Sequence, residues 1–407
     1  MRSQRFRYSI VLACMMSYGV GHAQFSGTLT GLGYSNPVSN TGKSFSISPD
    51  GKYVAGYEQA GFNPTRATLW SSATGMVNLG QINNDPSTEA VAYSSSANGS
   101  VVAGLSQDRV FRWTSSTGMV NIGYLPGGSF ARGGYVSRDG NVIVGQGNSF
   151  NSTFNEAFYY TTSGGLVGIG AFAGVPAGSY TSIAKAVSAD GSVIAGSAIT
   201  PAGIFNQYRW TSATGMVSLG TIPGSASFQG DPWGMSGSGN HIVGDARDSD
   251  TGLNTAYRWT SSQGMIRLGE LSPGFMSRAL AVTDDGKVVV GLAGTSSGSR
   301  AFIWDEAHGM RLLQTALQNE YGVTIPAGWN YFIDAYGIAG SLDSQLYITG
   351  SGLNPQGKTE SWIVTISSVP EPATWAMIGL FSTSLGVYLV CRMRHRHQLL
   401  DQEIQTS

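Results

Sequence analysis

Three aspartates, Asp245, Asp248 and Asp250, lie close together in the sequence and precede Gly252. Calcium prefers oxygen ligands such as carboxylates, and an Asp-x-Asp-x-Gly spacing lets a short loop wrap that ion. The segment lacks the distant bidentate glutamate of a complete calcium loop. The sequence therefore offers these three residues as a candidate calcium site, and it indicates no other cofactor.

Histidine and cysteine chemistry is scarce in this chain. His241 and His308 are the histidines of the central part, and they lie in different repeats without the paired spacing of a metal site. The two cysteines, Cys14 and Cys391, lie near the two ends. We therefore expect no histidine metal centre and no thiol nucleophile, and we predict no catalytic residue.

Four further aspartates could be read as the paired carboxylates of a hydrolase, but each stands directly before a glycine: Asp50, Asp139, Asp190 and Asp285. Aspartate favours turns because its side chain hydrogen-bonds to the nearby backbone. Asn98 and Ser238 occupy the same place in two other repeats, which suits a turn and not a catalyst. We interpret these acids as turn residues.

Composition excludes several classes of protein. The 407 residues include 57 glycines, about twice the usual share, while 12% are charged and 41% hydrophobic. Disordered chains are more charged and less apolar, and collagen needs glycine at every third position. Lys and Arg number 23 against 24 Asp and Glu, so no polybasic surface points to nucleic acid.

One unit is repeated six times along the chain. In its fourth copy it covers Ala186–Gly196 and then Tyr208–Gly220. A turn glycine and an aromatic residue recur in every copy, at Gly51, Gly99, Gly140, Gly191, Gly239 and Gly286, and at Trp70, Trp113, Tyr160, Trp210, Trp259 and Trp304. Successive copies lie 41 to 51 residues apart, a period typical of propeller blades. We expect the repeated tryptophans to be buried between adjacent blades.

Each copy divides into four short strands, because Asp-Gly and Thr-Gly dipeptides between apolar runs are typical of tight hairpins. A seventh, weaker copy over 335–364 lacks a fourth strand, and the segment 27–33 resembles one. We therefore predict that residues 24–367 form an all-β propeller of about seven four-stranded blades, with six and eight as alternatives. Thr28–Leu32 is expected to pair antiparallel with Ser361–Val364 and so close the last blade. One helix is expected over 312–321.

The two ends of the chain indicate export and anchoring. Arginines precede an apolar run and a small-residue cleavage site, so residues 1–23 are predicted to be a signal peptide, with lipoprotein processing at Cys14 as the alternative. An uncharged run over 375–391 is predicted to be a single transmembrane helix. Arg392, Arg394 and Arg396 follow it, and they predict a stop of translocation and a basic cytoplasmic tail over 392–407.

Two resemblances follow from these motifs. The unit that opens Ala-Val-Ser-x-Asp-Gly and closes Arg-Trp-Thr, Gly-Met-Val and Leu-Gly resembles the HAF family of extracellular repeats. Residues 368–374, the apolar run and the arginines resemble the PEP-CTERM sorting signal of Gram-negative bacteria. This second resemblance implies that Pro370, Glu371 and Pro372 are recognised by an exosortase-like sorting enzyme. Sixteen residues follow Cys391, more than in the usual tail of that family, which keeps a plain single-pass anchor as the alternative.

These features predict an exported protein that uses the Sec machinery and signal peptidase, crosses the inner membrane and then reaches the cell surface or extracellular matrix. The leading hypothesis is a non-enzymatic scaffold that binds a polysaccharide or another surface protein. The alternative is a secreted carbohydrate-active hydrolase or lyase that uses the central mouth of the propeller. A retaining glycosidase would need two carboxyl groups about 5 Å apart near the axis. An acidic cluster in the channel would favour this alternative, and a channel of small residues and backbone would oppose it.

Overall fold

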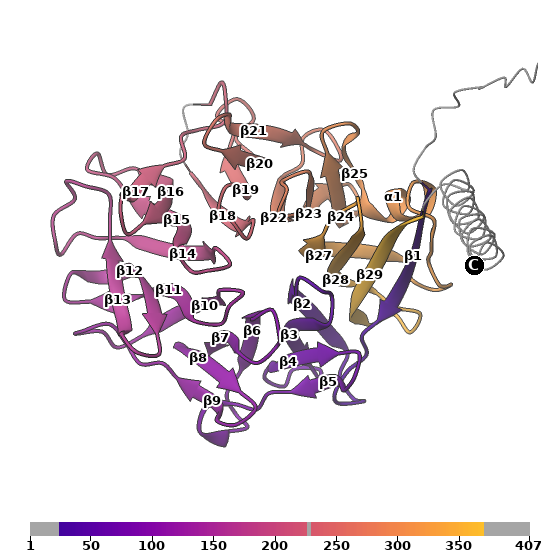
Figure 1. Ribbon diagram of the computed structural model, residues 1–407, viewed down its shortest axis with the longest axis horizontal. Helices are drawn as coiled ribbons and strands as arrows, with labels where there is room; N and C mark the ends of the chain where they lie inside the picture. The colour runs from indigo at the N-terminus through magenta and orange to yellow at the C-terminus, as the bar shows by residue number, and fades with distance from the viewer. Residues whose placement is uncertain (1–23, 226–228, 370–407) are drawn as a thin grey trace, which may run out of the picture. The chain divides into compact units, whose positions relative to one another are not determined.

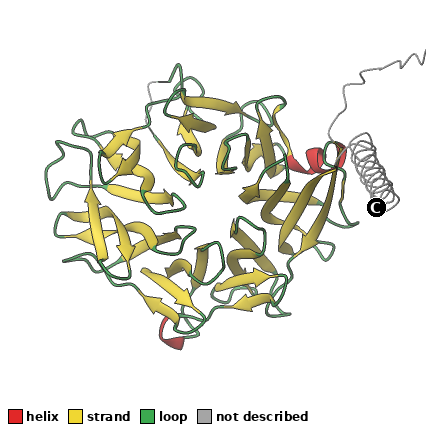
Figure 2. Ribbon diagram, in the orientation of Figure 1, coloured by secondary structure: helices red, strands yellow, loops and turns green. Residues whose placement is uncertain are grey.

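The computed structural model describes residues 24–225 and 229–369, and its folded unit extends from Phe25 to Ser367. Strands make up most of that unit, so the prediction of an all-β chain is confirmed (Figure 2). Several predicted segments lie outside the described residues: the signal peptide over 1–23, the Pro-Glu-Pro motif, the run over 375–391 and the arginines after it. Within the described part, no helix has the length and apolar character to cross a membrane.

Each of the six close repeats forms four antiparallel strands in chain order, as predicted (Figure 1). Five of them are separate four-stranded sheets, and the strands of the first repeat join those of the last through one parallel bridge between Thr41 and Thr359. The first three sheets consist of β2 (Thr41–Ile47), β3 (Tyr53–Gln59), β4 (Arg66–Ser71) and β5 (Gly75–Asn78); β6 (Ala90–Ser95), β7 (Val102–Ser106), β8 (Arg109–Thr114) and β9 (Gly118–Asn121); and β10 (Ala131–Val136), β11 (Val142–Ser149), β12 (Ser152–Thr161) and β13 (Gly165–Gly170). The next three consist of β14 (Ser182–Val187), β15 (Val193–Ile199), β16 (Phe205–Thr211) and β17 (Gly215–Ser218); β18 (Gly230–Met235), β19 (Ile242–Arg247), β20 (Asn254–Thr260) and β21 (Gly264–Gly269); and β22 (Ser277–Val282), β23 (Val288–Thr295), β24 (Gly298–Asp305) and β25 (Gly309–Leu312).

The seventh repeat supplies β27 (Tyr331–Gly340), β28 (Gln345–Leu353) and β29 (Thr359–Val369), and β1 (Gln24–Gly31) lies beside β29 in the same sheet. The Leu32 N–H donates to the Ser361 carbonyl at 2.9 Å, while Gly27 lies against Thr365. The two segments therefore run in opposite directions. On its other side β1 pairs with the parallel β26 (Val323–Thr324).

Two short helical segments interrupt this pattern of strands. The helix α1 (Leu313–Asn319) lies within the helical segment that the sequence predicts, and it buries Leu313 and Leu317 against the last two sheets. A single 3-10 turn, η1 (Ile82–Asn84), connects the first and second sheets. Neither segment contributes to the centre of the molecule.

The Asp-Gly turn between the first two strands of a repeat is built from side-chain hydrogen bonds. Asp190 accepts from the Ser188 hydroxyl at 2.7 Å and from the Ser192 backbone N–H at 3.0 Å. The Ser188 oxygen in turn accepts from the Val193 N–H at 2.9 Å. The same pattern recurs around Asp50, Asp139 and Asp285, so these acids have the turn role that their repeated position predicts.

Each turn glycine packs against the sheet before it. Gly99 lies on the ring of Tyr53, and Gly51, in the first repeat, lies on the ring of Tyr347 in the last. A Cβ at either glycine would overlap the ring, and both glycines have φ near +70°, which other residues rarely adopt. Small turns therefore let successive sheets approach closely.

The repeated tryptophans pack between neighbouring sheets to different depths. Trp259 and Trp304 are buried, as predicted, whereas Trp70, Trp113 and Trp210 are only half-buried. The Arg258 guanidinium lies over the Trp304 ring of the following sheet and donates to the Gly286 carbonyl at 2.9 Å. Arginine and tryptophan together therefore connect one repeat to the next.

Candidate functional site

The innermost strand of every sheet contains a β-bulge. A bulge leaves one residue outside the ladder and turns its side chain away from the regular alternation. The residues concerned are Phe45, Tyr93, Gly134, Lys185, Trp233, Leu280 and Tyr336. All but one carry a large side chain, although the residues before and after them are mostly alanine, serine or glycine.

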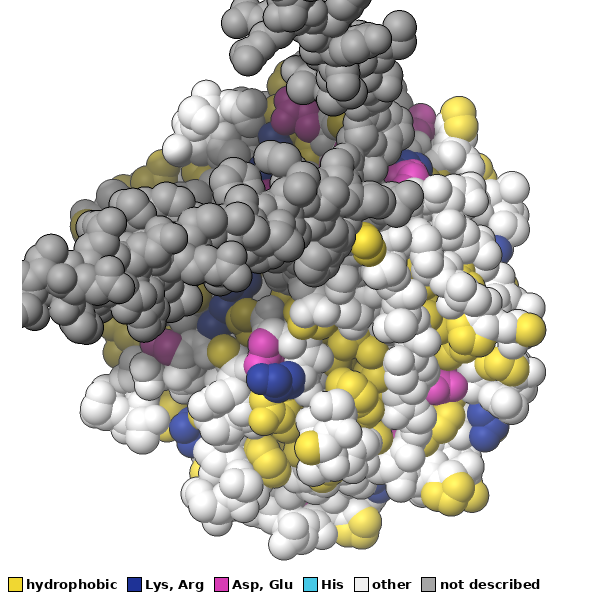
Figure 3. All heavy atoms as spheres, turned by 45° about the vertical axis from the view of Figure 1, so that its right-hand side comes forward, with side chains coloured by type: hydrophobic (Ala, Val, Ile, Leu, Met, Phe, Trp, Pro, Cys, Tyr) yellow, Lys and Arg dark blue, Asp and Glu magenta, His cyan; other side chains and the backbone are white. Residues whose placement is uncertain are grey.

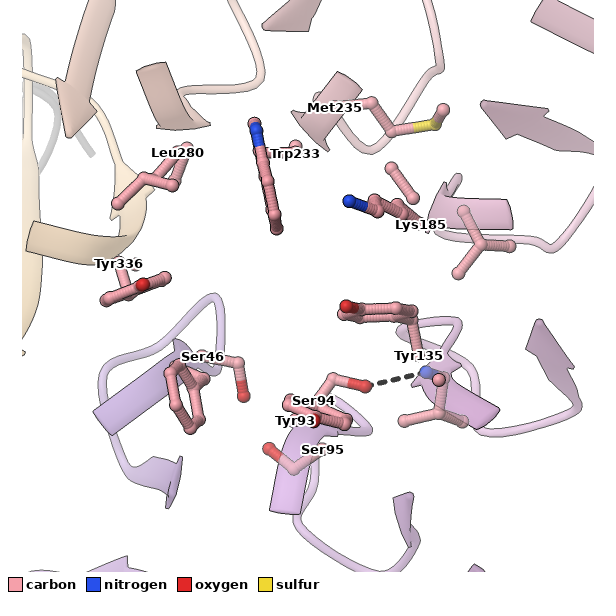
Figure 4. Close-up of a pocket in the computed structure, with 18 of the residues that line it drawn as sticks. Ser46, Tyr93, Ser94, Ser95, Tyr135, Lys185, Trp233, Met235, Leu280 and Tyr336 are labelled. Carbon is pink, nitrogen blue, oxygen red and sulfur yellow. Dashed lines mark hydrogen bonds between the residues drawn. The ribbon is translucent and has the colours of Figure 1, made fainter. Parts of the chain in front are cut away.

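These strands enclose a cavity of about 520 Å³, which we call the axial cavity. Residues of β2, β6, β10, β14, β18, β22 and β27 all line it. Figure 4 shows their side chains around one shared space, with Trp233 and Lys185 opposite Tyr93 and Ser46. Sheets that follow one another around a common centre define a known architecture. The fold is a β-propeller.

One half of the axial cavity is aromatic. The ring centroids of Tyr336 and Phe45 are 4.9 Å apart, those of Phe45 and Tyr93 are 5.6 Å apart, and those of Tyr93 and Tyr135 are 5.4 Å apart. In β10 the bulge residue is Gly134, and the large side chain belongs to the next residue, Tyr135. The result is an unbroken aromatic wall across four strands.

The phenols of this wall are protonated at neutral pH, and burial moves their titration further from it. Burial raises the pKa of the Tyr336 phenol to about 12, and it also raises the pKa values of Tyr93 and Tyr135 above their ordinary value. None of these three hydroxyls has a hydrogen-bond partner among the described residues. Each is therefore a neutral donor that a ligand could use.

The other half of the axial cavity is built around Trp233. Lys185 Nζ lies 3.7 Å from the centroid of its ring, and Arg278 Cζ lies 4.6 Å from it. The indole N–H donates to Asp245, a buried carboxylate that also accepts from Arg278 Nε at 3.1 Å. Lys185 pairs with Asp231 at 2.8 Å. Both cations are therefore neutralised, and Trp233 is fixed between them.

Two serine hydroxyls complete the lining. The oxygens of Ser46 and Ser95 are buried at the axial cavity, and neither has a hydrogen-bond partner among the described residues. By contrast, the neighbouring Ser94 oxygen accepts from the Val136 N–H at 2.6 Å, the bond that is dashed in Figure 4. An unsatisfied buried hydroxyl is costly in a folded protein. These two oxygens are therefore buried polar atoms beside the axial cavity that the described protein leaves unsatisfied.

An ion pair spans the ring near the turns at one end of the inner strands. Arg138, which follows β10 in the third sheet, donates to Asp284, which follows β22 in the sixth, at 2.5 Å. The Gly237 N–H donates to the same carboxylate at 2.6 Å. Because Arg138 also lines the axial cavity, this pair limits the cavity at the end where the Asp-Gly turns lie.

A second cavity of about 730 Å³ lies at the opposite end of β10. It shares Leu105 and Arg132 with the axial cavity, so the two are adjacent. Arg132 pairs with Asp108 at 2.7 Å, and both side chains are more than half exposed. The axial cavity is therefore continued toward solvent on this side by a more polar cavity.

The residues of the candidate calcium site do not converge. Asp245 points to Trp233 and Arg278, whereas Asp248 pairs with Arg267 and accepts from the Asp250 N–H at 2.9 Å. Among the residues that the structure describes, no three His, Cys, Asp or Glu side chains are grouped as metal ligands. The backbone bond and the arginines use the oxygens that calcium would need.

No carboxylate of the described chain lines the axial cavity. The lining is therefore neither the acidic cluster that would favour a hydrolase nor the channel of small residues that would oppose one. Sequence reasoning missed the aromatic lining because it compared the residues that the repeats share. The available signal was a position that varies: across the six close repeats, the residue five places before the Asp, Asn or Ser of the turn is different in each copy and is large in all but one.

Comparison with known proteins supports the fold. Neither a protein-family model nor a curated protein matches this sequence. A solved prolyl endopeptidase is similar over 82% of this chain, with 10% sequence identity and a TM-score of 0.50. Prolyl oligopeptidase B from Galerina marginata is similar over 78% with a TM-score of 0.48, and the Dos1 propeller over 85% with a TM-score of 0.42, each at 10% identity. The chain spans 51% and 50% of the two peptidases and 95% of the Dos1 propeller. At such identities the likeness concerns the fold alone.

Proposed function

We propose that this chain is an exported, non-enzymatic binding protein of the bacterial cell surface or matrix, and that its propeller holds its ligand in the axial cavity. The observation that carries this proposal is the lining of that cavity. Every inner strand contributes a large side chain to it, tyrosine from three strands and Phe, Lys, Trp and Leu from the other four, on a scaffold whose other positions repeat. A rigid scaffold that varies at one set of positions is typical of recognition.

We further propose that the scaffold is a closed ring of seven blades, with β1 as the fourth strand of the last one. Three contacts support closure. The Leu32–Ser361 hydrogen bond holds the N-terminal segment on β29. The packing of Gly51 on Tyr347 and a hydrogen bond from Thr349 Oγ1 to Ser44 Oγ at 2.9 Å join the first and last repeats. Closure leaves no open strand edge in the last blade and makes the cavity walls rigid.

The route to the surface rests on the sequence. Sec export and signal-peptide cleavage are supported by the predicted signal peptide. Sorting by an exosortase-like enzyme is supported by the Pro370-Glu371-Pro372 motif, the apolar run over 375–391 and the arginines after it. Charged side chains are scattered over the visible part of the face in Figure 3 and do not form one patch there. Resemblance to HAF repeats supports the same location.

The alternative, a carbohydrate-active hydrolase, is less well supported. A glycosidase positions two carboxyl groups on either side of the scissile bond. Asp231 and Asp245, which lie beside the Lys185–Trp233 side of the cavity, are each paired with a lysine or arginine and do not line it. Binding without cleavage therefore fits the described residues better.

Glycan-array binding of the full chain, with a hydrolysis screen of every retained glycan, tests this proposal. We expect retention without cleavage, and loss of retention in Trp233→Ala but not in Phe62→Ala, a change at a fully exposed loop residue. Cleavage of a retained glycan would establish the alternative function. Retention that is equal in both variants would show that the axial cavity is not the binding site.

A further inference from the structure

The lining of the axial cavity is chemically specific. It combines an apolar aromatic wall with hydroxyl groups that have no partner in the protein. Tyr93, Tyr135 and Tyr336 supply phenol hydroxyls that have no hydrogen-bond partner within the described chain. A complementary ligand must therefore present both apolar C–H groups and many hydrogen-bonding groups within a few ångströms.

The charges around the axial cavity are balanced in pairs. Lys185, Arg138 and Arg132 line it, and each has an aspartate partner at 2.8, 2.5 and 2.7 Å. An anionic ligand would have to compete with these carboxylates, and a cationic ligand would find no carboxylate in the lining. A neutral ligand disturbs none of the three pairs.

We propose that the axial cavity binds a neutral sugar ring at the end of an oligosaccharide, and this proposal rests on the binding function proposed above. The aromatic wall contacts the C–H face of the pyranose. The phenols of Tyr93, Tyr135 and Tyr336 donate to its hydroxyl groups. The rest of the oligosaccharide leaves past Arg132 and Leu105 into the second cavity.

Removing phenol oxygens while keeping the rings isolates this interaction. In the double variant Tyr93→Phe and Tyr135→Phe, the protein loses two hydroxyls that have no partner among the described residues, so we expect its thermal midpoint to be unchanged. Each lost hydrogen bond to a ligand weakens binding severalfold, so affinity should fall about tenfold. Tyr159→Phe is the matched control, since Tyr159 belongs to β12 and packs on Trp210 outside the axial cavity.

Isothermal titration of the full chain with maltose, cellobiose, lactose, glucuronate and 4-hydroxybenzoate gives the test. We expect at least one neutral disaccharide to bind the parent and Tyr159→Phe equally and the double variant about tenfold more weakly. A second outcome is that glucuronate or 4-hydroxybenzoate binds better than every neutral sugar and that Trp233→Ala abolishes this binding. That result would contradict the proposed ligand class but not the proposed binding function. Neutral sugars that bind the double variant as tightly as the parent would overturn the site. If the parent binds no probe and none of its host's exopolysaccharide, the proposed function itself fails.

Discussion

Lys43, in the innermost strand of the first sheet, and Asp334, in the innermost strand of the last, form an ion pair with 3.6 Å between Nζ and Oδ2. The Asp334 carboxylate is buried and also accepts from the Ser351 N–H and hydroxyl, each at 2.8 Å. Burial raises the pKa of Asp334, and Lys43 opposes this. The pair therefore connects the first and last repeats, and Lys43 stabilises the charged form of the buried Asp334 carboxylate.

The first prediction concerns this pair. Lys43→Ala should destabilise the protein by about 2 kcal/mol at pH 7, because it leaves a buried carboxylate without its cation. Its loss raises the pKa of Asp334 further above the unfolded value. When the pKa of a carboxyl is higher in the folded protein than in the unfolded chain, the protonated carboxyl favours folding. That contribution is present at low pH and is lost as the pH rises through the folded pKa. The deficit relative to the parent should therefore shrink toward pH 4. Urea unfolding at pH 7, 5.5 and 4 measures it, and a deficit that grows on acidification would contradict the assignment.

The second prediction concerns the N-terminal strand. Deletion of residues 25–34 removes β1 with its buried Leu29, together with the buried Leu32 that follows the strand, and it exposes one edge of β29. We expect a loss on the order of 5 kcal/mol, or aggregation, because two buried leucines and a strand pairing disappear together. Differential scanning calorimetry and size-exclusion chromatography record the two outcomes. A monomeric deletion variant with the parental midpoint would show that β1 does not close the last blade.

The third prediction uses the Asp-Gly turn. Hydrogen bonds from the Ser192 backbone, Ser188 and the Ser192 hydroxyl lower the pKa of Asp190 to about 2. Such a carboxylate stabilises the fold above its unfolded pKa and loses that effect as pH falls through the folded value. Asp190→Ala should therefore cost about 1 kcal/mol at pH 7 and much less at pH 2. Asp190→Asn is the control, since Asn98 fills this position in the second repeat with the same bonds. Urea unfolding at both pH values measures the change, and an Asp190→Ala deficit that is equal at pH 7 and pH 2 would contradict the role of the carboxylate.

The fourth prediction concerns the C-terminus. In the native host, mass spectrometry of the surface protein should find that the chain ends near Pro370. Glu371→Ala should abolish this processing, because the Pro-Glu-Pro motif is the element that the sorting enzyme is proposed to recognise, and a residue before proline favours extended backbone. A surface protein that still carries Gln405-Thr406-Ser407 would support the plain membrane anchor.

Much of the scaffold could be predicted because its signals are local and repeated. Local sequence patterns determine the Asp-Gly turns, the four strands per repeat, the helix near residue 313 and the seventh repeat. The segment 27–33 was recognisable as an orphan strand because it matches the fourth strand of the other repeats. The arrangement of β1 beside β29 follows from that match.

The site was not predictable in the same way, because it depends on where the variable residues meet. Lys185 and Trp233 are 48 positions apart in the sequence, and only the curvature of the array brings them to one cavity. The bulges in the inner strands also break the alternation that assigns a strand residue to one face. Asp245 illustrates the difference: sequence spacing suggested a metal ligand, and the fold makes it the partner of Trp233 and Arg278.

The central claim, that the axial cavity is the binding site, is tested most directly by filling it. Ala281 lines the cavity from β22, at the repeat position that Tyr135 holds in β10. In the full chain, Ala281→Trp should keep the parental thermal midpoint, because the cavity of about 520 Å³ has room for an indole. The same variant should bind the host's exopolysaccharide at least tenfold more weakly in isothermal titration. Parental affinity in a folded Ala281→Trp protein would place the ligand elsewhere and contradict the account.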